Sequence, residues 1–183
     1  MSGKLKNSVL LLFLVLILLV GSSIEAGSLP SEEKIKAAFL LKFSDYVQWP
    51  APAVSAASAP VRIAIVGEDP FRGILPGEIP PTGFGNFGYV ITRIEVESRA
   101  ISTFQVLYFS ETHGRKTANS LRDLQGKPIL TVGEGREFLE NGGIIAFQTE
   151  NHRVRFLVNL ENARRAGLKL SSNLLSLAAR IFQ

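Results

Sequence analysis

Apolar residues recur along the chain with two periods, one typical of helices and one typical of strands. Helical spacing predicts helices over 31–49, 68–75, 117–124, 134–140, 160–166 and 172–181. Short β-branched runs and alternation predict strands over 61–67, 89–96, 104–109, 128–132, 144–148 and 154–158. The hairpin-sized connection 149–153 makes the expected sheet mixed. We therefore expect an α/β protein, a single compact domain with a mixed β-sheet flanked by helices on both faces.

The first of these helices has more apolar surface than one stripe requires. Ser31 is the expected N-cap and Pro50 the expected stop, and the stripe contains Ile35, Phe39, Phe43, Tyr46 and Val47. Leu40 and Leu41 lie off this stripe, so the helix is either deeply buried or has a second, partner-facing surface. Trp49 is the only tryptophan, and tryptophan is enriched at binding hot spots. Leu40 and Trp49 are therefore candidate partner-binding residues, with burial in the core as the alternative.

The last predicted strand places arginines on one side only. Val154, Phe156 and Val158 fall on one face, whereas Arg153 and Arg155 fall on the other. If the second face is covered, Arg155 needs a carboxylate or backbone partner. If it is open, Arg153 and Arg155 form a basic, donor-rich patch, and we add both to the candidate partner-binding residues. Asn159 is expected to cap the helix that follows.

The N-terminus has the three regions of a secretory signal. Lys4 and Lys6 precede the unbroken apolar run 9–20, and small residues follow it. A bilayer-spanning helix needs about 20 residues, which this run does not reach. We expect residues 1–26 to be a signal segment that is cleaved after Ser23 or Ala26, and 27–183 to be the mature domain. An uncleaved membrane anchor is the alternative.

Composition argues against several classes of function. The net charge is only +4 and the basic residues are scattered, which does not fit a nucleic-acid binder. The chain has no cysteine, so thiolate metal sites and thiol chemistry are excluded. His113 and His152 lie in polar stretches without a second histidine nearby, and no GxSxG motif or paired-carboxylate signal is present. We expect no catalytic residue, no metal and no cofactor.

Two glycine motifs have ordinary structural explanations. The string 83–88 matches GxGxxG, but it follows two prolines and precedes a predicted strand. A dinucleotide site needs the reverse order, strand then helix, so this string is expected to be a loop. Gly133-Glu134-Gly135 lies between a strand and a helix but lacks the third glycine. We interpret it as a plain turn.

In order along the chain, the segments IKAAFLLKFSDYVQWP, VRIAIVGEDPF, PILTVGE, NGGIIAF and RVRFLVNLENARRAGLKLSSNLLSLA resemble the YfiR-like family of periplasmic proteins. The resemblance extends from about Glu33 to Ile181. Its most specific parts are WP after an aromatic-rich helix, GG before a strand, and the RVxFxxN…AGLxLSSxLLxLA tail. The family's namesake has cysteines that form disulfides, and this chain has none.

The resemblance implies a regulatory protein without enzymatic activity. It implies a periplasmic repressor that binds a membrane-bound diguanylate cyclase or sensor kinase and thereby lowers cyclic di-GMP output. It also implies homodimers, and an outer-membrane lipoprotein that sequesters the repressor. A small-ligand-binding sensory protein of the envelope is the alternative function.

Overall fold

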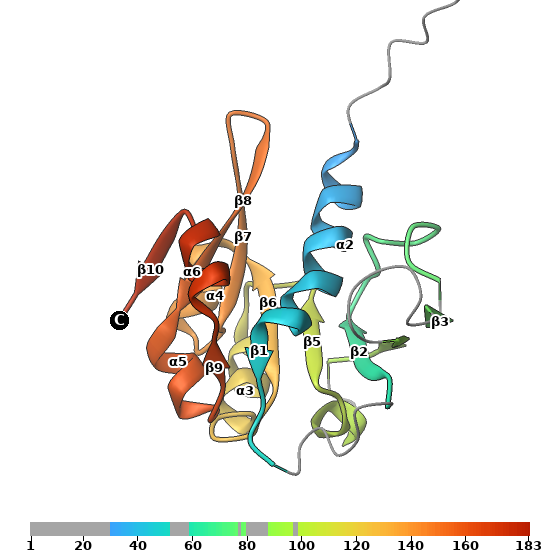
Figure 1. The fold of residues 1–183 in the computed structure, drawn as a ribbon. Coiled ribbons are helices and arrows are strands. Elements are labelled where there is room, and N and C mark those ends of the chain that lie inside the picture. Colours follow the sequence, from blue (N-terminus) through green and yellow to red (C-terminus); the bar gives the residue numbers. More distant parts are fainter. Residues whose placement is uncertain (1–29, 52–58, 77, 80–87, 97–98) are drawn as a thin grey trace, which may run out of the picture. The chain divides into compact units, whose positions relative to one another are not determined.

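A computed structural model describes residues 30–51, 59–76, 78–79, 88–96 and 99–183, and within them eight strands form one sheet (Figure 1). The strands of this sheet are β2 (Val61–Val66), β3 (Glu78–Ile79), β4 (Tyr89–Ile94), β5 (Val106–Phe109), β6 (Leu130–Glu134), β7 (Ile145–Glu150), β8 (Arg153–Asn159) and β10 (Arg180–Phe182). Strands β1 (Val47–Gln48) and β9 (Lys169–Leu170) form a separate antiparallel pair. The helices are α2 (Glu32–Phe43), η1 (Ser44–Tyr46), η2 (Arg99–Thr103), α3 (Arg115–Asp123), α4 (Gly135–Glu140), α5 (Leu160–Arg165) and α6 (Ser172–Leu177).

The sheet is mixed, as the sequence predicts. Its strand order is β10-β8-β7-β6-β5-β2-β4-β3. Strands β4, β2, β5, β6 and β7 are parallel, and β3 is antiparallel to β4. Strand β8 returns antiparallel to β7, and β10 then adds parallel to β8. Residues 31–183 form one compact unit, which confirms the predicted fold class.

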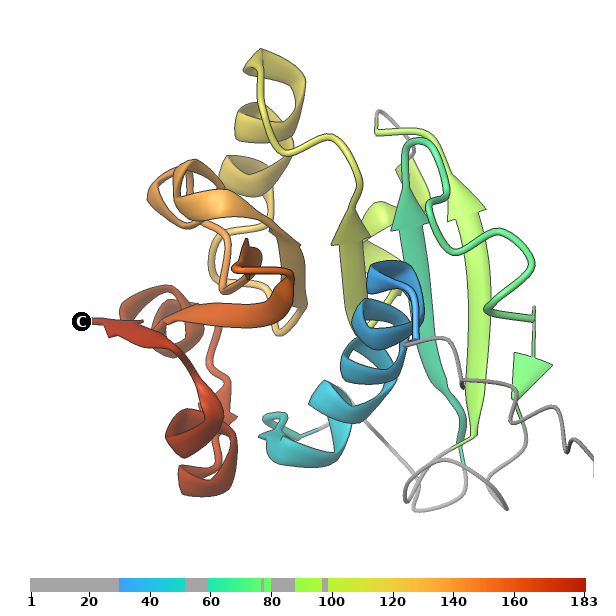
Figure 2. The same cartoon turned by 90° about the horizontal axis from the view of Figure 1, so that it is seen from above.

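Helices cover both faces of the sheet because successive side chains of a strand point to opposite sides. Figure 2 shows α2 and α6 on one side and α3 and α4 on the other. The first core cluster joins α2 to the strand residues Ile63, Ile65, Val106, Tyr108, Leu130, Val132, Ile145, Phe147, Phe156 and Val158. The second joins α3 and α4 to Ala64, Val66, Leu107, Phe109, Ala146 and Leu157. The alternation within each strand therefore builds two separate cores.

Helix α2 begins as predicted but ends earlier. The Ser31 hydroxyl accepts a hydrogen bond from the backbone N–H of Lys34 (3.4 Å), so Ser31 is the N-cap. The helix ends at Phe43 and not near Pro50, and the Ser44 hydroxyl donates to the Leu41 carbonyl just after it (2.8 Å). Tyr46 still lies in the short 3-10 helix η1, so the predicted helix is wrong only from Val47 onward. Val47 instead pairs with Leu170, a contact between distant parts of the chain.

Two other predicted helices also differ. Residues 68–75 form turns, because Asp69 accepts a hydrogen bond from the Phe71 N–H (2.7 Å) and forms an ion pair with Arg93 (2.8 Å). A side chain that bonds the backbone locally competes with helix formation. Helix α6 stops at Leu177, and the chain enters β10 after the Ala179 N–H donates to the Phe156 carbonyl (2.8 Å). The helix predicted over 172–181 is therefore wrong beyond Leu177.

The hairpin between β7 and β8 is tighter than the predicted connection 149–153. Asn151 and His152 are its two turn residues, and both have positive φ angles of 49° and 59°. Two consecutive left-handed residues match the twist of a two-residue hairpin. In Figure 1 this hairpin extends beyond the neighbouring strands, with Arg153 directly after the turn.

Some predictions fall outside the described residues. These are the signal segment 1–26, most of the low-complexity loop 51–60 and all of the GxGxxG string 83–88 except Gly88. Among the residues that the structure does describe, no helix has the length and apolar character needed to cross a membrane.

Candidate partner-binding surface

The four predicted partner-binding residues do not lie on one surface. The Leu40 side chain is 0% exposed and belongs to the core cluster beneath α2. Trp49 is partly buried and packs against the same cluster, and its indole N–H has no hydrogen-bond partner among the described residues. The prediction that Leu40 contacts a partner is corrected here, because a fully buried side chain offers no surface. Burial in the core, the alternative, holds for Leu40.

Arg153 and Arg155 lie on the face of the sheet opposite α2, on a part of β8 that is exposed. Val154 packs with the α2 core, so its neighbours Arg153 and Arg155 point to the side of the sheet that carries α3 and α4. Both arginines are exposed. Neither forms an ion pair within the described part of the chain. Arg153 and Arg155 therefore keep their hydrogen-bond donors free for another molecule.

Helix α4 and strand β10 add two more guanidinium groups around one aromatic ring. The guanidinium carbon of Arg136 lies 5.4 Å from the centre of the Phe182 ring, and that of Arg180 lies 5.9 Å from it. Arg180 aligns with Leu157 in the parallel register, which places it on the same face as Arg155. Arg136 also pairs with Glu140 (2.7 Å). We call Arg136, Arg153, Arg155, Arg180 and Phe182 the basic sheet face.

The basic sheet face borders a shallow hollow. The hollow has a volume of about 390 Å³ and is lined by Arg136, Gln148, Glu150, Leu157, Ala179, Arg180 and Phe182. Gln148 donates to Glu150 (2.9 Å), so the Glu150 carboxylate is partly engaged. Arginine forms bidentate hydrogen bonds with carboxylates and stacks on aromatic rings. The surface is therefore suited to an acidic group of a protein partner.

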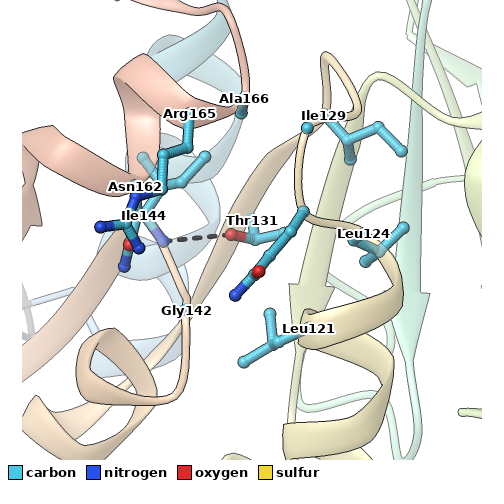
Figure 3. Close-up of a pocket in the computed structure, with 11 residues that line it drawn as sticks. Leu121, Leu124, Ile129, Thr131, Gly142, Ile144, Asn162, Arg165 and Ala166 are labelled. Carbon is cyan, nitrogen blue, oxygen red and sulfur yellow. Dashed lines mark hydrogen bonds between the residues drawn. The ribbon is translucent and has the colours of Figure 1, made fainter.

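A second, smaller pit lies between α3 and α5 (Figure 3). Its volume is about 20 Å³, which is room for about one water molecule. Two of its polar side chains are already engaged: Thr131 accepts from the Ile144 N–H (3.0 Å), and Asn162 donates to the Gly143 carbonyl (2.8 Å). The pit is too small for an organic ligand.

The histidines and the second glycine motif lie apart from the basic sheet face. The Nδ1 atom of His113 is 2.8 Å from a carboxylate oxygen of Glu137, and His152 lies in the hairpin turn. Within the described ranges, no three histidine, aspartate or glutamate side chains are grouped to hold a metal ion. Gly133 and Glu134 end β6, and Gly135 begins α4 with a φ of +76°. Gly133-Glu134-Gly135 is thus the plain strand-to-helix turn that the sequence predicts.

Sequence reasoning missed Arg136, Arg180 and Phe182. Arg180 and Phe182 fell within or beside a predicted helix, and a strand of three residues is too short to show its own alternation. Arg136 is a surface residue of a six-residue helix, and nothing in its local sequence marks it. Only the pairing of β10 with β8 brings these residues beside Arg155.

A comparison with known protein families matches most of the chain. Residues 33–179 match the family model described as YfiR/HmsC-like. The matched region begins in the first turn of α2 and ends at the entrance to β10. The match confirms the resemblance found in the sequence.

Proposed function

We propose that this chain, which belongs to the YfiR/HmsC-like family, is a regulator that binds a membrane signalling protein through the basic sheet face. The family is periplasmic and regulatory rather than catalytic. In the specific proposal, the partner is an inner-membrane diguanylate cyclase, or a related sensor kinase, and binding lowers its output.

Repression follows from binding one state of the partner more tightly than the other. A soluble domain shifts a two-state receptor only by its differential affinity for the two states. A hundredfold preference for the inactive state corresponds to about 2.7 kcal/mol. No covalent step is needed, so the regulator requires a complementary surface and no catalytic group.

The observation that supports this surface is the set of exposed arginines on an open part of the sheet. Arg153, Arg155 and Arg180 lie on the same face of the sheet, and none of them forms an ion pair within the described residues. Exposed charges contribute little to the free energy of folding, so folding stability does not account for three arginines at this position. Arginine is also among the residues enriched at binding hot spots. The basic sheet face is thus the best candidate for the contact.

Export and further partners complete the proposal. The mature protein begins at Ile24 or Gly27 after removal of the signal segment. An outer-membrane lipoprotein sequesters the repressor, and the repressor forms a homodimer. For the small-ligand alternative, the candidate site is the hollow of about 390 Å³ at the basic sheet face, because the pit of Figure 3 has room for only about one water molecule.

Deletion of the gene, compared with charge reversal on the basic sheet face, tests the function. The deletion strain should contain more cyclic di-GMP than the parent strain. The variants Arg153→Glu and Arg155→Glu should each raise cyclic di-GMP without lowering the melting temperature. Arg72→Glu is the matched control, because Arg72 is exposed in a turn beside the other end of the sheet.

The proposal fails if the deletion leaves cyclic di-GMP unchanged. If the deletion raises it but both charge reversals repress normally, the regulator function stands and the basic sheet face is not the contact. The Arg72→Glu control shows whether any loss comes from the charge change alone.

A further inference from the structure

Among the residues that the structure describes, strand β10 forms an edge of the sheet and pairs on one side only, with β8. The Phe156 carbonyl accepts from Ala179, whereas the Asn159 N–H donates to Ile144 on the β7 side. Even-numbered residues of β8 therefore direct their backbone groups toward β10, and Val158 is one of them. In a parallel ladder, only one residue of each aligned pair directs its backbone groups into the ladder. Ile181 aligns with Val158, so the N–H and C=O of Ile181 point outward.

The two sides of this edge differ in chemistry. Arg180 and Phe182 lie on the basic sheet face. On the other side, Ile181 aligns with Val158 and is 39% exposed. Leu177 is 59% exposed and ends α6, the helix whose Leu174 packs in the core on this same side. Within the described ranges, Ile181 and Leu177 are the two large hydrophobic side chains that are exposed. The edge is thus basic on one side and apolar on the other.

From this arrangement we infer that β10 accepts an extended segment of the membrane partner as an added strand, and that this segment alternates acidic and apolar side chains. Side chains of an added strand alternate between the two faces, and neighbours across strands contact each other. Acidic residues of the segment would face Arg180, and apolar residues would face Ile181 and Leu177. The inference rests on the proposed function in assigning the segment to the membrane partner.

Charge decides between this occupant and a second copy of the chain. Pairing of β10 with β10 of a second copy would place two basic sheet faces side by side in one continuous sheet. Like charges on adjacent strands are destabilising. Strand β10 also has only three residues, so few backbone hydrogen bonds form and side-chain contacts must supply most of the affinity. An acidic and apolar segment supplies them on both sides.

Synthetic peptides of about eight residues, a typical strand length, test the inference on the mature chain at low ionic strength. The first peptide alternates glutamate and valine, the second replaces glutamate with lysine, and the third is the first with N-methyl groups along one backbone edge. Fluorescence anisotropy should show the first peptide binding. The second and third should bind about tenfold more weakly, a difference of about 1.4 kcal/mol.

Two variants of one residue separate the backbone from the side chain. Ile181→Ala removes the apolar contact, and Ile181→Pro also removes the outward N–H, which β8 does not use. Ile181→Pro should therefore bind the glutamate–valine peptide about tenfold more weakly than Ile181→Ala does. A circular dichroism melt shows whether both variants stay folded. The N-methylated peptide tests the other outward backbone bond of Ile181, from a peptide N–H to the Ile181 carbonyl, on the unaltered protein.

The inference is wrong if the glutamate–valine peptide does not bind, or if its N-methylated form binds equally well. Neither result would contradict the proposed function, which is tested separately by the level of cyclic di-GMP in the deletion strain. If the peptides behave as expected but the deletion leaves cyclic di-GMP unchanged, the edge accepts an acidic strand from a different partner.

Discussion

The ammonium group of Lys36 lies 2.8 Å from a carboxylate oxygen of Glu134 and joins the first turns of α2 to the end of β6. Glu32 approaches the same ammonium group to 2.7 Å. The Tyr108 hydroxyl donates to the same Glu134 oxygen (2.9 Å), and Thr149 donates to Glu32 (2.6 Å). Burial alone would lower the pKa of Lys36, but its hydrogen bonds to Glu134 and Glu32 raise it overall. Burial, and then the Glu134 charge, raise the pKa of Tyr108, so its hydroxyl stays a donor.

Acid should weaken this attachment of α2. The hydrogen bonds from Lys36 and then Thr149 lower the pKa of Glu32. A lowered pKa means that the contribution of Glu32 to stability is complete above its unfolded-state pKa, about 4.3, and is lost as the pH falls through the folded-state value. Glu32→Gln should therefore lower the melting temperature by more at about pH 7 than at about pH 3.

Thermal melts across that pH range give the comparison. Glu33→Gln is the control, because Glu33 is the exposed neighbour in the same helix turn. A constant difference between Glu32→Gln and the unaltered protein at all pH values would contradict the prediction.

Removing the ammonium group of Lys36 should lower the free energy of unfolding by less than removing both carboxylates that pair with it. Lys36 has a side chain that is only 9% exposed, whereas those of Glu32 and Glu134 are 39% and 42% exposed. Lys36→Met leaves two carboxylates that water can reach, so the expected loss is about 1 kcal/mol. The double variant Glu32→Gln, Glu134→Gln leaves a buried ammonium unpaired, and the expected loss is about 3 kcal/mol. Urea unfolding measures both, and the reverse order would show that the carboxylates, not the ammonium, are the groups that need the pair.

A methyl group at Gly143 should destabilise the protein strongly. A Cβ atom there would overlap the Phe138 ring and lie 2.7 Å from the Phe138 carbonyl oxygen, and Phe138 is completely buried. Gly143→Ala should therefore cost about 3 kcal/mol in urea unfolding. Gly126→Ala is the matched control. Gly126 has a φ of +76°, but no atom lies within 4 Å of the place that a Cβ would take, so the expected loss is only about 1 kcal/mol. Equal losses would show that the Phe138 contact relaxes at little cost.

The sequence predicted the central strands because their signal is local. In β2, the residues Ile63 and Ile65 enter one core while Ala64 and Val66 enter the other, so the run reads as buried on both faces. The ends of helices were harder. Val47 leaves its helical position to pair with Leu170, and such a contact between distant residues has no local signature.

Only part of the candidate surface could be predicted, because the rest depends on contacts between distant parts of the chain. Alternation along one strand was enough to place Arg153 and Arg155 together on one face. Arg180 joins them only because the chain leaves the helix after Leu177 and pairs beside Leu157. After that exit, Ile181 is 39% exposed.

Leu40 and Leu177 should respond in opposite ways to substitution, although both are leucines in helices. Leu40 is fully buried, so Leu40→Ala should cost about 3 kcal/mol in urea unfolding through the lost contacts and the cavity. Leu177 is 59% exposed, so Leu177→Asp should change stability by no more than about 0.5 kcal/mol.

The new carboxylate of Leu177→Asp would nevertheless stand on the apolar side of the β10 edge, where it removes an apolar contact and repels an acidic segment. Leu177→Asp should therefore raise cyclic di-GMP in cells while the protein stays folded. Leu177→Asn separates lost apolar contact from added charge, and normal repression by Leu177→Asp would confine the contact to the basic sheet face.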